Sequence, residues 1–151
     1  MALWGRGVVG LAAEIAAFRS GSGDPGSLVG EFRRALLLVP FAVGSAGGED
    51  GLMSAMSGGV RWLYAFTDEE ALARFAVARG DAGREWPYLA VLGARLVDAI
   101  VPQVGGPAGV AVNVADGNGS MLFPPVAGIV PDVCAVDIGP EADHEAAAGV
   151  A

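Results

Sequence analysis

Few side chains of the kind used in catalysis occur in this chain of 151 residues. General acid–base and nucleophilic catalysis usually require a histidine, or a pair of carboxylates, held in a protected pocket. The single histidine, His144, stands between Asp143 and Glu145, a setting typical of a solvated acidic segment. The single cysteine, Cys134, has apolar neighbours and is predicted to behave as a small buried hydrophobe. The pattern therefore does not favour a Cys134–His144 dyad.

Metal and phosphate sites are also not indicated. One cysteine and one histidine cannot make a zinc site without added carboxylates. The run Asp68, Glu69 and Glu70 could hold a cation, but it also suits the first turn of a helix, with Thr67 as N-cap and Glu70 completing a capping box. The glycine-rich segments 44–48 and 117–119 lack the spacing of phosphate-binding loops. We therefore expect no metal, no cofactor and no catalysed reaction.

Three aromatic residues are the candidates for binding a partner. Trp62 and Tyr64 alternate along a predicted strand, so that one face of it carries both rings. Trp86 stands just before the next predicted strand. Such residues usually belong to a core, but on a sheet covered on one side they would form an exposed patch that anchors a partner. The predicted interaction surface includes this face and the Gly/Ser-rich loop 44–59.

An alternative is a small-molecule sensor or an enzyme, with its site at the carboxyl ends of the strands. Thr67 and Asn113 each follow a predicted strand. In open α/β sheets the ends of neighbouring parallel strands meet at one edge, where ligands commonly bind. This hypothesis predicts that Thr67 and Asn113 lie together beside a concave polar pocket.

The hydrophobic pattern predicts strands that alternate with helices. Val8, Leu11, Ile15 and Phe18 have helical spacing, as do Leu28, Phe32 and Leu36. Further helices are expected over residues 67–79, 92–100 and 126–130. Strands are expected over residues 36–41 (covered on both faces), 60–66, 86–92, 109–114, 120–123 and 133–138.

This order predicts one α/β domain with a mixed central sheet of about five strands, packing helices and a terminal β-hairpin. Residues 1–26 are predicted to form an N-terminal helix and a flexible linker. Residues 27–138 are predicted to form the α/β domain, and residues 139–151 a disordered acidic tail.

Charge and composition limit the cellular compartment and the classes of partner that are expected. A net charge of −8 argues against nucleic acid and against an anionic membrane surface. The longest apolar run, residues 35–43, is far shorter than the roughly 20 residues of a membrane helix. A single cysteine fits a reducing compartment, so we expect a cytoplasmic protein. All nine basic residues are arginine, which suggests a high-GC bacterium. The expected partner is another protein or a second copy in a homodimer.

Three motifs resemble the SseB N-terminal domain family. They are R-A-L-L-L-V-P-F-A-V at residues 34–43, W-L-Y-A-F-T-D-E-E-A-L-A-R-F at 62–75 and G-V-A-V-N-V at 109–114. The resemblance is expected to span about residues 28–130. Family members commonly continue the asparagine with Pro-Gly, whereas here Val114 and Ala115 follow Asn113. The resemblance supplies no catalytic residues to carry over, which favours a non-catalytic binding module.

Overall fold

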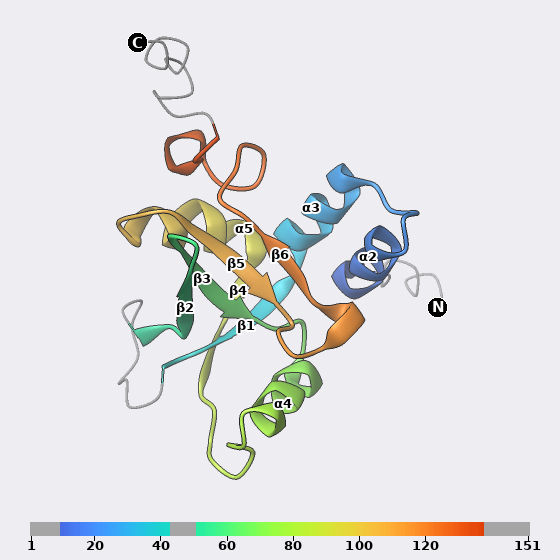
Figure 1. The fold of residues 1–151 in the computed structure, drawn as a ribbon, viewed down its shortest axis with the longest axis vertical. Coiled ribbons are helices and arrows are strands. Elements are labelled where there is room, and N and C mark those ends of the chain that lie inside the picture. The colour runs from blue at the N-terminus through green and yellow to red at the C-terminus, as the bar shows by residue number, and fades with distance from the viewer. Residues whose placement is uncertain (1–9, 43–50, 138–151) are drawn as a thin grey trace.

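The computed structural model describes residues 10–42 and 51–137, which form a mixture of helices and strands (Figure 1). The helices are α2 (Gly10–Arg19), α3 (Pro25–Arg34), α4 (Glu69–Ala78) and α5 (Gly93–Arg95). Helix α5 continues as a π-helical turn (Leu96–Ile100) and a 3-10 turn (Val101–Gln103). The strands are β1 (Leu36–Pro40), β2 (Ser54–Ser57), β3 (Val60–Ala65), β4 (Tyr88–Leu92), β5 (Ala108–Val112) and β6 (Met121–Phe123). Two further 3-10 turns span Gly117–Gly119 and Asp132–Cys134.

The strands form two joined sheets. The larger has the order β2-β3-β5-β6, in which β3 and β5 are parallel and the other pairs antiparallel. Strands β1 and β4 form a separate antiparallel pair, called the β1–β4 ribbon below. Leu38 and Phe66 exchange two backbone hydrogen bonds of 2.8 Å, which tie the ribbon to the end of β3. The predicted mixed α/β domain with a final β5–β6 hairpin is therefore confirmed.

The main core lies between the sheets and the helices α2, α3 and α5. Apolar side chains alternate along β3 and β5, so Leu63, Ala65, Val110 and Val112 all enter this core. At its centre Phe32 of α3 stacks on Phe123 of β6, with ring centroids 4.3 Å apart. Stacked aromatic pairs contribute about 0.5–1.5 kcal/mol beyond the area they bury. This stack fixes α3 against the far strand of the larger sheet.

Helix α4 packs apart from the other helices, at the lower end of the view in Figure 1. It buries Leu72 and Phe75 against Phe66 and Leu38 in a second cluster, called the α4 cluster below. The Phe66 and Phe75 rings lie 5.2 Å apart. The ribbon thus contributes side chains to both cores and positions α4 relative to the sheets. None of the described helices is both long and apolar enough to span a bilayer.

Two connections differ from their predictions. The predicted loop 44–59 contains strand β2, which pairs with β3 through a two-residue turn at Gly58 and Gly59. Both glycines have positive φ, of 62° and 82°, which is the backbone that tight hairpin turns require. Residues 43–50 of that loop lie outside the described residues. The predicted linker ends earlier than expected, because Asp24 caps α3 through Ser27 N at 2.9 Å.

The last two predicted elements are wrong. Residues 126–130 form a turn, not a helix, with Gly128 at a φ of 92° and Pro131 disfavouring helical geometry at the residue before it. Residues 133–137 include no strand, and a 3-10 turn spans Asp132–Cys134. Val133 is 90% exposed, so the apolar run has no sheet face to cover.

Candidate functional site

The three aromatic candidates lie in two places. Trp62 is half-buried over the backbone of β5, where a Cβ on Gly109 would come within 2.8 Å of its ring. Tyr64 and Trp86 instead meet the ring of Phe75 edge-on, with centroids 5.4 and 5.7 Å away. Trp86 also donates its indole N–H to the carbonyl oxygen of Asp81 at 3.0 Å. Packing in the α4 cluster accounts for Tyr64 and Trp86 without a partner.

Thr67 and Asn113 do lie together, but they bind each other. The Thr67 N–H donates to Asn113 Oδ1 at 3.0 Å, and Asn113 Nδ2 donates to Thr67 Oγ1 at 3.1 Å and to the Gly119 carbonyl at 3.4 Å. Asn113 is only 3% exposed, so its amide forms hydrogen bonds within the protein and is not open to a ligand. The two residues connect the ends of the parallel strands β3 and β5.

Thr67 is the predicted N-cap of α4, and this prediction is wrong because Thr67 bonds Asn113 instead. Asp68, rather than Thr67, is the N-cap, and its carboxylate accepts a hydrogen bond from Ala71 N at 2.8 Å. Because the Thr67 hydroxyl is bonded to Asn113, it does not serve the helix. Glu69 and Glu70 occupy the first turn, where the helix dipole favours negative charge.

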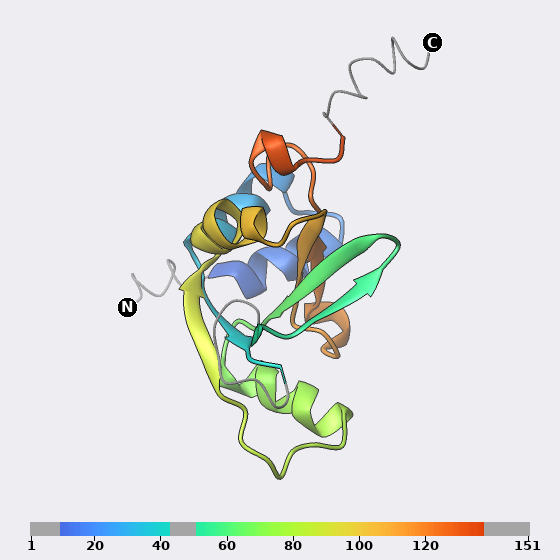
Figure 2. The ribbon, with the colours of Figure 1, turned by 90° about the vertical axis from the view of Figure 1, so that its left-hand side faces the viewer.

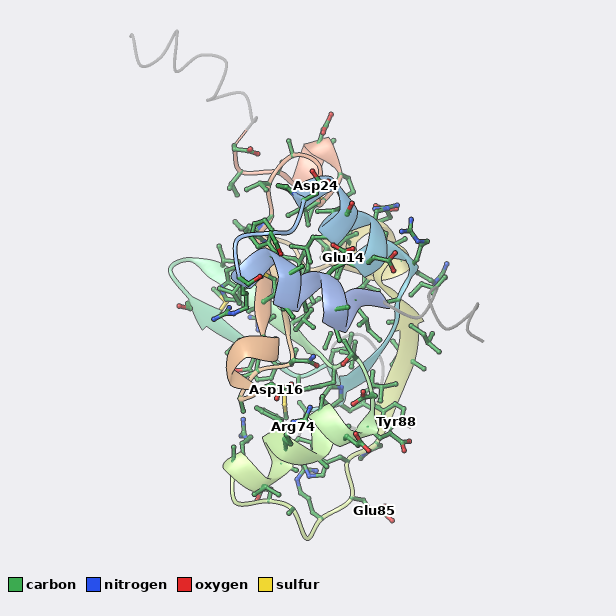
Figure 3. The ribbon with its side chains drawn as sticks, turned by 90° about the vertical axis from the view of Figure 1, so that its right-hand side faces the viewer. Glu14, Asp24, Arg74, Glu85, Tyr88 and Asp116 are labelled. Atoms are coloured by element: carbon green, nitrogen blue, oxygen red, sulfur yellow. The ribbon has the colours of Figure 1, made fainter. Side chains whose placement is uncertain are left out.

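The loop after β5 carries unusual backbone geometry. Asn113 and Ala115 have φ values of 54° and 77°, and asparagine tolerates that region whereas alanine does not. An ion pair holds the loop to α4, because Arg74 donates two hydrogen bonds of 3.0 Å to Asp116 (Figure 3). This hydrogen bonding raises the pKa of the Arg74 guanidinium above its usual value.

Replacing Ala115 by glycine is expected to stabilise the domain. The alanine Cβ strains a left-handed backbone at a cost of about 1 kcal/mol, and glycine removes the clash at a smaller entropic cost. Chemical denaturation should show a higher midpoint for Ala115→Gly with an unchanged slope. An equal or lower midpoint would show that the loop does not hold this conformation in solution.

The face of the β1–β4 ribbon that points away from the main core is exposed and apolar at its Leu36 end, whereas Leu38 and Pro40 on that face are buried. Leu36 and Leu92 lie directly opposite each other across the ribbon and are 58% and 47% exposed. Ala90, on the same face, is also exposed. The opposite face enters the core through Leu37, Val39 and Val91. The prediction that the strand 36–41 is covered on both faces therefore fails at Leu36.

Strand β4 is also an edge strand, with β1 as its only neighbour among the described residues (Figure 2). Gly93 N bonds the Ala35 carbonyl, and Phe41 N bonds the Pro87 carbonyl. Because hydrogen-bonded pairs alternate along an antiparallel ladder, the N–H and C=O groups of Tyr88, Ala90 and Leu92 point away from β1. Such an unpaired row is a template for an added strand.

An open groove of about 650 Å³ joins this face to the start of α4. Its apolar side is formed by Leu36, Leu38 and the Tyr88 ring, and residues 67–70 form its acidic wall. The Tyr88 hydroxyl donates to Glu69 Oε2 at 2.5 Å, and this bond raises the pKa of Tyr88 (Figure 3). No basic side chain is among the described residues that line the groove.

No metal-binding cluster is found in the described part of the chain. No group of three His, Cys, Asp or Glu side chains in residues 10–42 and 51–137 could hold a metal ion. Cys134 is partly buried and packs against the main core. His144 lies outside the described residues, so the structure does not place the Cys134–His144 pair.

Sequence reasoning missed the ribbon as a candidate surface. Its strands are two separate apolar runs, at 36–40 and 88–92, and their pattern alone does not show which residues remain exposed. The available signal was Pro87, because proline beside a strand indicates an edge.

Comparison with known proteins places the fold in a family. The SseB protein N-terminal domain matches residues 11–126, which begins within α2 and ends after β6. The match starts earlier than the expected residue 28 and includes the first helix. No curated protein and no solved structure matches the chain. The match covers well over half of the sequence, and the chain therefore belongs to the SseB N-terminal domain family.

Proposed function

We propose that this domain is a non-catalytic binding module that holds a partner protein at the β1–β4 ribbon. An extended segment of the partner adds to the free edge of β4. Backbone hydrogen bonds supply affinity in this recognition mode, and alternate side chains supply specificity. Catalysis is not part of the proposal, because the polar side chains at the strand ends bond each other.

The observation that carries the proposal is the exposed pair Leu36 and Leu92 beside an unpaired edge. Fully burying one leucine contributes about 1.5–3 kcal/mol, so covering two half-exposed side chains contributes about as much as burying one. The small exposed Ala90, two residues before Leu92 on the same face, leaves room for side chains of an added strand. The ribbon thus offers both backbone pairing and apolar contact.

The charges around the ribbon indicate which charges the bound segment of the partner should carry. At the Tyr88 end the groove is walled by Asp68, Glu69 and Glu70, with no basic residue among those that line it. At the other end Arg34 has a largely exposed side chain, although it pairs with Glu31 at 2.9 Å. We expect the bound segment to place a lysine or arginine at the acidic end. Attraction to the acidic wall favours this register of the added strand, and repulsion disfavours a register that brings a carboxylate there.

Net charge and composition indicate the class of partner and the cellular setting. A net charge of −8 disfavours nucleic acid and anionic membranes as partners. We infer a reducing, cytoplasmic setting in a high-GC bacterium from the single cysteine and the all-arginine basic residues.

The test is an affinity capture that compares matched variants. Tagged wild-type protein, Leu36→Asp, Leu92→Asp and Met56→Asp are exposed to host lysate, and co-purifying proteins are identified by mass spectrometry. Met56 is the control, because it is exposed to the same 58% as Leu36 and lies on β2, an edge strand of the larger sheet.

We expect one protein to be captured by the wild type and by Met56→Asp, and its affinity to fall at least about tenfold in both ribbon variants. Circular dichroism confirms that each variant is folded. Equal capture by all four proteins, or loss in Met56→Asp alone, would contradict the proposal.

A second candidate occupant of the same edge is another copy of this chain. Antiparallel pairing of two β4 strands about a two-fold axis would place Ala90 near the axis and the acidic end of each ribbon beside the Arg34 end of the other. Analytical ultracentrifugation distinguishes the cases: a dimer lost in Leu92→Asp identifies the second copy, and a monomer identifies a different protein.

A further inference from the structure

A hollow lies under the β2–β3 hairpin, on the core side of the sheet. Its volume is about 340 Å³, within the range of small-molecule sites. Its lining includes four apolar side chains, but polar groups from the hairpin and from the 3-10 turn make up most of its open surface. The lining residues are Leu52, Ser54, Arg61, Leu63, Ile100, Gln103 and Val104.

Arg61 is the charged group of this hollow. Its Nη1 donates to Ser54 Oγ at 2.9 Å, which orients the guanidinium with a neutral partner. Among the described residues Arg61 forms no ion pair, and no carboxylate lines the hollow. Arg61 is exposed, so a carboxylate from solution can reach its guanidinium.

The opposite wall is an irregular helix. Val101 N bonds the Leu96 carbonyl five residues back, and Pro102 follows without an N–H to continue the regular pattern. Such π-helical turns occur frequently at functional sites. Leu52, Ile100 and Gln103 line this hollow and also a neighbouring one of about 300 Å³, so the two hollows join there. The other residues that line the second hollow are apolar except for Arg95.

We propose that this hollow binds a small carboxylate that carries an apolar tail. The planar guanidinium of Arg61 matches a carboxylate through two parallel hydrogen bonds, and one guanidinium balances one negative charge. A phosphate, with a larger charge, would call for further cations that the lining does not supply. The tail lies on Leu52 and Ile100, and Gln103 stands at the point where the two hollows join.

The experiment uses octanoate, octanol and octylammonium as probes of equal chain length. Each is titrated into the wild type, Arg61→Gln and Arg34→Gln and followed by protein NMR shifts. Arg34→Gln is the matched control, because it removes the same charge at a distance from the hollow. We expect octanoate to bind with shifts at Leu52 and Ile100, and octanol and octylammonium to bind at least tenfold more weakly.

Arg61→Gln should weaken octanoate binding at least tenfold, and Arg34→Gln should leave it unchanged. No saturable binding of octanoate, equal binding of octanol, or equal effects of the two variants would overturn the proposal. Leu36 lines neither hollow, so Leu36→Asp is expected to bind octanoate normally, which separates this site from the proposed partner surface.

Discussion

Gly93→Ala is expected to destabilise the domain by roughly 3 kcal/mol or more, the upper end of what overpacking a core costs. Gly93 is buried where β4 passes into α5, and its N–H bonds the Ala35 carbonyl at 2.9 Å. A Cβ at this position would overlap the carbonyl oxygen of Phe32 and come within 2.9 Å of its carbonyl carbon. Backbone atoms cannot rotate away as a side chain can, so α3 and the ribbon must separate.

Urea denaturation measures this effect, with Gly83→Ala as the control. Gly83 has open space around the position of a Cβ and no unusual φ, so its replacement should change stability by no more than about 0.5 kcal/mol. A Gly93→Ala protein as stable as Gly83→Ala would show that α3 and β4 do not approach each other this closely.

The second large effect is expected at Asn113, where Asn113→Ala should cost about 2–4 kcal/mol. The change removes the acceptor of Thr67 N–H and the donor to the Gly119 carbonyl, and leaves these partly buried groups unpaired. It also puts an alanine at a φ of 54°, which adds strain. Asn113→Gly removes the same hydrogen bonds without the strain and should be less destabilised.

These variants also separate the structural role from the alternative ligand site. If Thr67 and Asn113 hold the ends of β3 and β5 together, Thr67→Val should cost about 1 kcal/mol, the value of one lost hydrogen bond. Thermal and chemical unfolding should rank the variants Asn113→Ala, Asn113→Gly, Thr67→Val, wild type, in order of rising stability. Unchanged stability in all three would instead favour a ligand-binding role.

Much of the architecture could be predicted because local and global signals agree. The unit from Val60 to Ala78 carries a strand, an acidic first turn and an amphipathic helix, and each has its own pattern. The motifs at 62–75 and 109–114 also led to the correct family. The meeting of Thr67 and Asn113 followed from the rule that parallel strands end at one edge.

Strand β2 was not predicted because its sequence, S-A-M-S, has weak strand propensity. Pairing with β3 makes it a strand, and this tertiary effect overrides local preference. The turn Gly58-Gly59 was the available signal for a hairpin.

The exposure of particular side chains was beyond sequence patterns. Leu36 and Leu37 are identical in type, yet one is exposed and the other fully buried. Which face of β1 enters the core depends on the register with β4, a contact made across some fifty residues of chain. The sequence likewise does not distinguish Arg61 from the other eight arginines. Only the fold shows that it lines a hollow with Ser54, Leu63 and Ile100.

Docking at the ribbon edge is tested most directly by residue-resolved amide hydrogen exchange with and without the captured partner. In the free protein the amides of Tyr88, Ala90 and Leu92 should exchange fast, whereas those of Leu89 and Val91, which face β1, should be protected. Strand addition predicts that the partner slows exchange at the first three and changes the other two little. A partner that binds while the amides of Tyr88, Ala90 and Leu92 keep their free exchange rates would contradict docking at the ribbon edge.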